Sequence, residues 1–162
     1  MDSMVTPLEE AFTHKNVRPE ARRLMITAAL VVLVHTVVVL LHGAAHLQLK
    51  IELNWWAKIY VVSVVGIGPI IGLSFLKSSR QRTGALILFL TMIGALAFGL
   101  WNHFITQGAD HVMHLQAGPW RFPFQVTAGL LACSELAGVV VAFALLVTLN
   151  SQTTARARTS PD

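Results

Sequence analysis

Residues 31–49 read VVLVHTVVVLLHGAAHLQL. The stretch is long and apolar enough for a helix to cross a bilayer, yet it carries His35, His42 and His46 at intervals of seven and four residues. At about 100° per residue, these intervals place the three imidazoles within roughly 40° of one another on one helix face. An imidazole without polar partners is costly in hydrocarbon, so this face is predicted to point into a helix bundle and away from lipid.

The rest of the chain has the same apolar character. Its 162 residues are 54% hydrophobic and 12% charged, with a mean hydropathy of +0.63. A soluble domain carries about 25% charged residues, so the composition predicts an all-α integral membrane protein. The apolar runs predict a four-transmembrane-helix bundle at residues 23–150, with spans at about 24–47, 55–76, 84–104 and 124–149. Residues 1–22 are predicted to be a cytosolic N-terminal segment, and residues 151–162 a disordered cytosolic tail.

The orientation follows from the distribution of basic residues. Nine Lys and Arg flank the spans on the side of the termini and the second link, against three on the other side. By the positive-inside rule, both termini are predicted to be cytoplasmic, in a plasma membrane of bacterial type. The basic residues therefore serve topology, and no nucleic-acid partner is expected. The four tryptophans (Trp55, Trp56, Trp101 and Trp120) are expected at the outer interface.

Several function classes are excluded by what the sequence lacks. Cys133 is the single cysteine, so thiol oxidoreductases that work through cysteine pairs are excluded. There is no phosphate-binding loop, no serine nucleophile elbow and no DNA-binding motif. The first twenty residues show no apolar core with a cleavage site, so the first span is expected to act as its own insertion signal.

The link between the third and fourth spans contains further ligand-type residues. Residues 105–123 read ITQGADHVMHLQAGPWRFP. Asp110 is predicted to cap a short extracytoplasmic helix that carries His111 and His114 on one face and ends at Gly118. With this topology, five histidines gather at the outer end of the bundle: His42, His46, His103, His111 and His114.

These histidines predict a metal centre. The expected ligands are His42, His46, His111 and His114, with Asp110 as a ligand or as the partner that orients one. Nitrogen-rich sets suit Cu, Zn or Fe. The boxes HGAAH and DHVMH resemble those of membrane di-iron desaturases and hydroxylases. Those enzymes use more histidines and place them on the cytosolic side, so no residue roles are carried over from them.

A b-type haem is the other form of this centre. It would take His42 or His46 of the first span and His103 of the third as axial ligands, with Gly43 and Gly99 leaving room. Small residues at intervals of four lead up to His103, and such a groove admits either a neighbouring helix or a flat cofactor. Packing between helices is the expected role of the groove.

A second expectation concerns His35 and Glu135. At 1.5 Å per residue, both lie about 17 Å below the outer ends of their spans, so they are predicted to form an intramembrane pair that carries protons.

Together these features predict a polytopic membrane protein with a histidine-rich centre near the outer face, in a redox, electron-transfer or metal-dependent enzymatic role. The alternative is a non-catalytic accessory or assembly subunit of a larger respiratory-type membrane complex, because the spans are rich in small residues and the hydrophilic segments are short. The expected partners are the lipid bilayer and either other membrane subunits or further copies of the chain.

Overall fold

The protein is described by a computed structural model that covers residues 19–159, with side chains to residue 151. Within this range all regular structure is helical, and four helical spans are long and apolar enough to cross a membrane. The all-α, four-span prediction is confirmed. The spans are α2 (Pro19–Gln48); α3 (Trp55–Tyr60), the π-helix η1 (Val61–Ile67) and α4 (Gly68–Leu76); α5 (Gln81–Leu100) with the π-helix η2 (Trp101–Ile105); and α6 (Arg121–Thr159).

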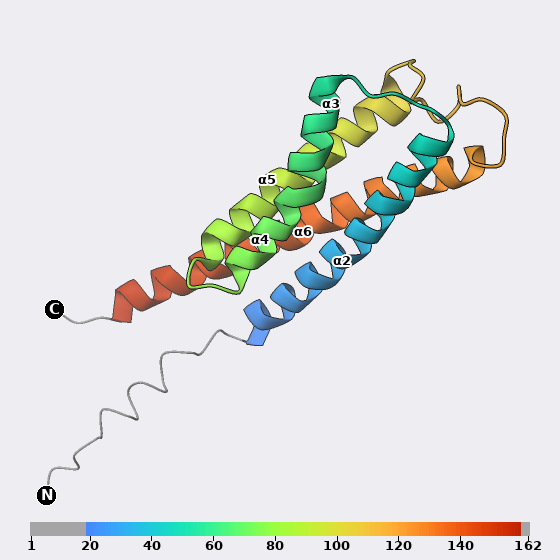
Figure 1. Cartoon of the computed structure of the whole chain (residues 1–162). Helices are drawn as coiled ribbons and strands as arrows, with labels where there is room; N and C mark the ends of the chain where they lie inside the picture. Colours follow the sequence, from blue (N-terminus) through green and yellow to red (C-terminus); the bar gives the residue numbers. More distant parts are fainter. Residues whose placement is uncertain (1–18, 160–162) are drawn as a thin grey trace, which may run out of the picture.

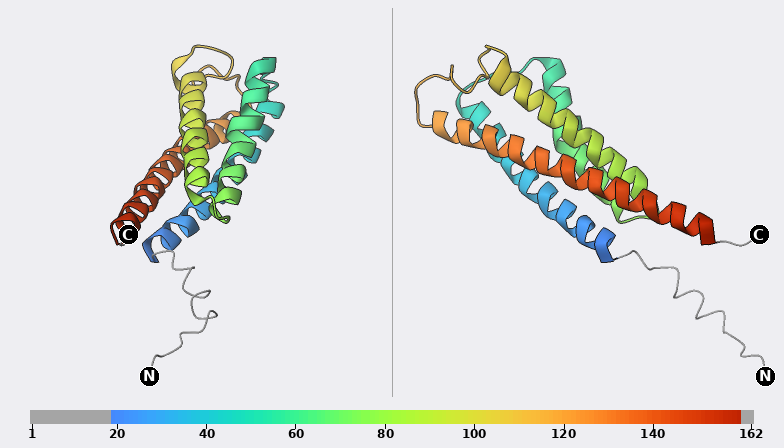
Figure 2. Two further views of the ribbon diagram at one scale, coloured as in Figure 1. Left: turned by 90° about the vertical axis from the view of Figure 1, so that its left-hand side faces the viewer. Right: turned by 180° about the vertical axis from the view of Figure 1, so that it is seen from behind.

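The four spans run antiparallel to their neighbours in sequence (Figure 1). Links 49–54 and 106–120 lie at one end of the bundle, here called the histidine end, and link 77–80 lies at the other. Extensive contacts join α2 to α6, α6 to α5 and α5 to α4, whereas α2 meets the second span only through small contacts with η1 and α4 (Figure 2). The bundle is therefore least closed between α2 and the second span.

The outward faces are apolar, as a bilayer requires. Large side chains on α2, α4, α5 and α6 remain exposed, for example Leu40, Ile70, Leu90 and Val140. Such a belt is compatible with an integral membrane protein, because lipid tails cover it without cost.

The helices begin and end up to ten residues outside the predicted bounds, most of all at the two ends of the chain. The first helix starts at Pro19, a residue suited to the first helical position because its missing N–H has no partner there in any case. The last helix continues to Thr159, ten residues beyond the predicted end of the fourth span, into the segment predicted to be a disordered tail. The other residues of the predicted terminal segments, 1–18 with His14 and 160–162, lie outside the described range.

The predicted short helix in the third link is also wrong. Residues 106–120 form turns and bends. Val112 N donates to the His103 carbonyl at 3.0 Å, and Gln125 Nε2 donates to the Val112 carbonyl at 2.7 Å. These bonds fold the link back over the ends of η2 and α6, and the Asp110 side chain faces histidines where it was expected to cap a helix.

Close packing of α4 against α5 explains Gly72 and Gly84, which lie on either side of link 77–80. A Cβ on Gly84 would lie 2.5 Å from Leu76 N and 2.8 Å from the Gly72 carbonyl oxygen. A Cβ on Gly72 would lie 3.0 Å from Leu88 N. Both neighbours are backbone atoms that cannot move cheaply, so glycine is needed for α4 and α5 to approach this closely.

The interior is divided along the bundle. The main apolar core fills the half away from the histidine end, around Val32, Leu88, Met92 and Leu145. A smaller cluster of Ala45, Phe124 and Leu115 closes the histidine end, where Leu115 comes from link 106–120. The polar residues of the interior lie between these two cores.

Candidate metal centre

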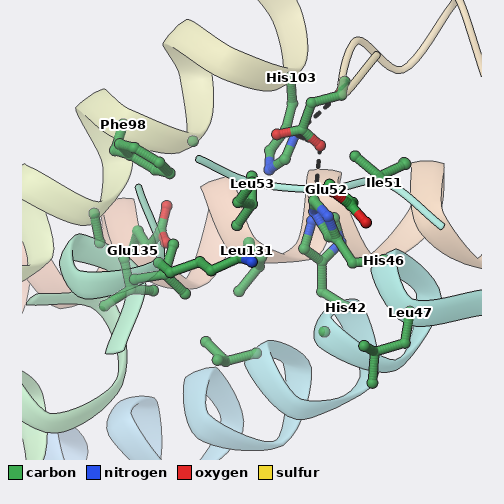
Figure 3. A pocket seen from close by; sticks show the side chains of 18 of the residues that line it. His42, His46, Leu47, Ile51, Glu52, Leu53, Phe98, His103, Leu131 and Glu135 are labelled. Atoms are coloured by element: carbon green, nitrogen blue, oxygen red, sulfur yellow. Dashed lines mark hydrogen bonds and ion pairs between the residues drawn. The ribbon is translucent and has the colours of Figure 1, made fainter. Parts of the chain in front are cut away.

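Three histidines from two spans converge between the cores. His42 and His46 come from α2 and His103 from η2, and one ring nitrogen of each lies within 4.8 Å of the others (Figure 3). The ring centroids are 4.8 Å apart for His42–His46, 4.8 Å for His42–His103 and 6.0 Å for His46–His103.

Local structure explains how the three side chains meet. His42 and His46 are one helical turn apart, so both project from the inner face of α2. His103 is the buried residue of η2, whose wide turn is closed by Thr106 N donating to the Trp101 carbonyl at 2.8 Å. The Phe124 ring packs against all three imidazoles, at centroid distances of 4.5, 5.0 and 5.5 Å, and forms an apolar wall behind them.

Asp110 orients two of the imidazoles. Its carboxylate Oδ1 lies 3.2 Å from both His46 Nε2 and His103 Nδ1. Its main-chain carbonyl oxygen lies 3.1 Å from the same His103 Nδ1. A carbonyl only accepts hydrogen bonds, so the ring proton of neutral His103 belongs on Nδ1. His46 Nε2 faces the Asp110 carboxylate at ion-pair distance.

Thr127 orients the third imidazole. Its Oγ1 lies 2.7 Å from the Pro123 carbonyl oxygen, to which the hydroxyl must donate. The same Oγ1 lies 2.9 Å from His42 Nδ1 and therefore accepts a hydrogen bond from it. His42 is thus held with its proton on Nδ1.

Each neutral imidazole then keeps one nitrogen lone pair for another partner. Among the described residues, three buried atoms of the site make no hydrogen bond: His42 Nε2, His46 Nδ1 and Asp110 Oδ1. In metal sites the ligating histidine also donates its other ring N–H to a carboxylate or carbonyl. Four-coordinate ligands at about 2.0–2.1 Å are about 3.3 Å apart, so modest side-chain rotations would bring the three nitrogens onto one ion.

The environment of Asp110 favours its charged form. Burial raises its pKa, but the ring N–H of His103 and the positive charges that His103, His46 and His42 carry when protonated outweigh this effect and lower the pKa below 3.8. The carboxylate therefore stays charged at neutral pH.

A cavity of about 570 Å³ lies beside the three histidines. All four spans contribute to its wall, and Glu135 of α6 faces it (Figure 3). A Cβ added at Gly99 would lie 3.6 Å from Glu135 Oε2 and 4.0 Å from His103 Cδ2, so both side chains border the cavity next to Gly99.

The predicted ligand set is only partly assembled. His42, His46 and Asp110 are brought together, but His111 and His114 stack on each other at 4.5 Å within the link and do not belong to the three-histidine group. His103, which was assigned only to the haem alternative, takes their place. The predicted set treated link 106–120 as a helix with both imidazoles on one face, whereas the link forms turns and bends.

The predicted pair of His35 and Glu135 is also corrected. His35 Nε2 lies 3.0 Å from the Val65 carbonyl oxygen, and its Nδ1 lies 3.4 Å from Ser134 Oγ. The estimate of equal depth for His35 and Glu135 was one residue away from the observed neighbour, Ser134. However, neighbouring residues point about 100° apart on a helix, so α6 turns Ser134 toward α2 and Glu135 toward the cavity.

His35 links α2 to the second span just before Pro69. Its Nε2 donates to the Val65 carbonyl, which lies in η1 four residues before Pro69, a residue without an N–H. The Ser134 hydroxyl near its Nδ1 donates to the Leu131 carbonyl at 2.9 Å, so the link between the two spans rests on Nε2.

Thr127 is the site residue that sequence reasoning missed. It lies three residues from the predicted start of its span, and His42 lies five residues from the predicted end of the first. Measuring depth from the outer ends of the spans, as was done for His35 and Glu135, would have placed Thr127 and His42 at a similar depth in the bundle.

The geometry favours a bare ion over haem. The His42 ring is within 4.8 Å of both other rings, and Asp110 Oδ1 bridges His46 and His103 at 3.2 Å. A macrocycle between any two of these histidines would have to displace the third ring and the carboxylate. A single ion needs only the nitrogen lone pairs.

Fold and site together define a four-span helical bundle, compatible with a membrane protein, in which three histidines could hold a metal ion. Comparison with protein-family models, with curated proteins and with solved structures gave no match.

Proposed function

We propose that this protein is a metal-dependent membrane enzyme in which His42 Nε2, His46 Nδ1 and His103 Nε2 bind one transition-metal ion. The observation that carries the proposal is the hydrogen bonding of the three imidazoles. One nitrogen of each lies next to a protein oxygen, one ring nitrogen of each lies within 4.8 Å of the others, and His42 Nε2 and His46 Nδ1 are buried without a partner. Buried imidazoles that only packed would be expected to satisfy both nitrogens.

The arrangement supports catalysis more than a purely structural metal. Structural sites close all four positions with protein ligands, whereas catalytic sites use three and leave one open. Three nitrogen ligands would leave one position for another ligand, and the cavity that these histidines line has room for a substrate. Three imidazoles suit Cu, Zn or Fe, and a redox metal would make the chemistry an electron transfer to or from the cavity.

The location belongs to the same proposal. The positive-inside count puts the histidine end on the outer side of a plasma membrane, with both termini in the cytoplasm. The metal would then be acquired from the outer side. Further copies of this chain or other membrane subunits would cover part of its apolar surface.

Metal analysis of the purified protein tests the proposal. The full-length protein, expressed with added Zn, Cu and Fe and purified in detergent, should contain about one metal ion per chain. His42→Ala, His46→Ala and His103→Ala should each lose most of it, because incomplete sites lose affinity steeply. The matched control is the double variant His111→Ala, His114→Ala, which should keep its metal.

Full occupancy in the double variant His42→Ala, His46→Ala would overturn the proposal. Wild-type protein that holds no metal and co-purifies with a larger complex would support the accessory-subunit alternative.

A further inference from the structure

The carboxyl of Glu135 faces the cavity beside the candidate metal centre and is not one of the proposed metal ligands. Glu135 is 2% exposed and lines the cavity, and its carboxyl makes no hydrogen bond or ion pair within the described part of the chain. A carboxyl in this position is costly unless a ligand in the cavity supplies the partner. Removing such a group from a purely structural bundle would stabilise it.

The wall around Glu135 is apolar and partly flat. Val61, Val65 and Leu131 line one part of it, and Phe98 lines another next to Gly99. The Phe98 ring is held by stacking on Tyr60 at 4.9 Å, with an angle of 22° between the planes. Gly99 leaves room above the helix, so a flat ring there would contact Phe98, Glu135 and His103 together.

The cavity opens to the exposed surface of the bundle. Its rim includes Gly43, Leu47 and Lys58, which are exposed, and Leu47 is 81% exposed. These residues belong to α2 and α3, the side on which the bundle is least closed. A ligand entering here comes from the bilayer and must be largely apolar.

Size and charge restrict the ligand further. About 570 Å³ is within the range of about 300–1,000 Å³ that holds small organic ligands. Lys50 and Glu52 of link 49–54 and Lys58 of α3 line the rim, so the entrance carries charges of both signs. This rim favours neutral ligands over strongly anionic lipids.

We infer that the cavity binds a quinol-type lipid, in which a flat ring carries hydroxyl or carbonyl groups on an apolar chain. The ring lies over Gly99 beside Phe98, one ring oxygen forms a hydrogen bond with Glu135, and the chain leaves between α2 and α3. The inference deepens the proposed function and rests on it in one respect: the ligand is a substrate only if the three histidines hold a metal.

Ligand-induced stabilisation tests the inference. The probe is decylubiquinol, added to the full-length protein in nanodiscs, and the readout is the midpoint of thermal unfolding against probe concentration. We expect a saturable rise for the wild type. Glu135→Leu should bind about tenfold more weakly, as expected for loss of one buried hydrogen bond. Without probe, Glu135→Leu should melt at the same temperature as the wild type or higher.

Two glycine variants provide a steric test. Gly99→Ala adds a methyl group at ordinary contact distance from Glu135 and His103, so it should fold normally and weaken probe binding. Gly129→Ala adds the same group on α6 with no atom within 4 Å and away from the cavity, so it should bind like the wild type.

The outcomes separate the two proposals. Lack of saturable stabilisation, or equal binding by wild type, Glu135→Leu and Gly99→Ala, would overturn the inference even if metal is present. Equal stabilisation by dodecanol would overturn the requirement for a ring. Probe binding by protein that carries no metal would support the ligand site and contradict the metal proposal.

Discussion

Thr127 decides which nitrogen of His42 is available to a metal. Its hydroxyl donates to the Pro123 carbonyl and so accepts from His42 Nδ1, which leaves Nε2 free. A side chain without the oxygen would let the ring rotate or change tautomer.

Thr127→Val should therefore weaken metal binding while preserving shape. We expect an affinity loss of about 10- to 100-fold, the usual effect of removing a group that orients a ligand. Competition with a chelator of known affinity measures it, and Thr127→Ser should restore most of the loss. Equal affinity in the valine variant would show that Thr127 does not orient His42.

Asp110 makes stability depend on pH. Its pKa in the folded protein is below the ordinary value of 3.8, mainly because the ring N–H of His103 faces it, against the opposing effect of burial. A carboxyl with a lowered folded pKa stabilises the protein above its unfolded pKa and loses this effect as the pH falls through the folded pKa.

Asp110→Asn should accordingly lower the melting temperature of metal-free protein at pH 6, and the difference from wild type should shrink as the pH falls below 3.8. Thermal melts between pH 6 and pH 2.5 measure it, with Glu52→Gln, an exposed carboxylate on the cavity rim, as the control. A difference that stayed constant over this range would contradict the assigned charge.

At the scale of elements, π-helical turns place the polar groups. η2 buries His103 at the end of the third span, and η1 precedes Pro69 in the second. His35 donates to the Val65 carbonyl of η1, which couples α2 to a span it otherwise contacts little.

A double-mutant cycle tests this coupling. His35→Leu removes the side-chain donor to the Val65 carbonyl and should cost about 1–3 kcal/mol. In a Pro69→Ala background, the new N–H of residue 69 can bond to this carbonyl, so the same change should cost less. Equal losses in both backgrounds, measured by unfolding in detergent, would mean that the contribution of His35 does not come from its bond to the Val65 carbonyl.

At the scale of the molecule, the features that could be predicted are those that depend on the length of apolar runs and on the spacing of residues along them. Four spans follow from apolar runs, and the clustering of His42, His46 and His103 follows from antiparallel connection of those spans. The partners of His35 and Glu135 were not predictable, because depth alone does not tell which of two adjacent residues faces a neighbour. The course of link 106–120 depends on contacts of Asp110 with distant histidines, which no local pattern encodes.

Orientation is the main whole-molecule prediction. Nine basic residues against three predict that both termini lie in the cytoplasm. Reporter fusions at Asn54 and Gly118 should read outside and a fusion at Ser79 should read inside. A cytoplasmic signal from Gly118 would place the histidine end on the inner side and contradict the proposed location.

The central claim is that three imidazoles share one ion, and X-ray absorption at the edge of the bound metal tests it most directly. The wild-type spectrum should show about three imidazole nitrogens at about 2.0–2.1 Å with one further light ligand. His103→Ala should show about one imidazole fewer in whatever metal remains, and the double variant His111→Ala, His114→Ala should match the wild type. A wild-type spectrum with haem-like coordination, or an imidazole count that falls in the His111 and His114 variant and not in His103→Ala, would contradict the account.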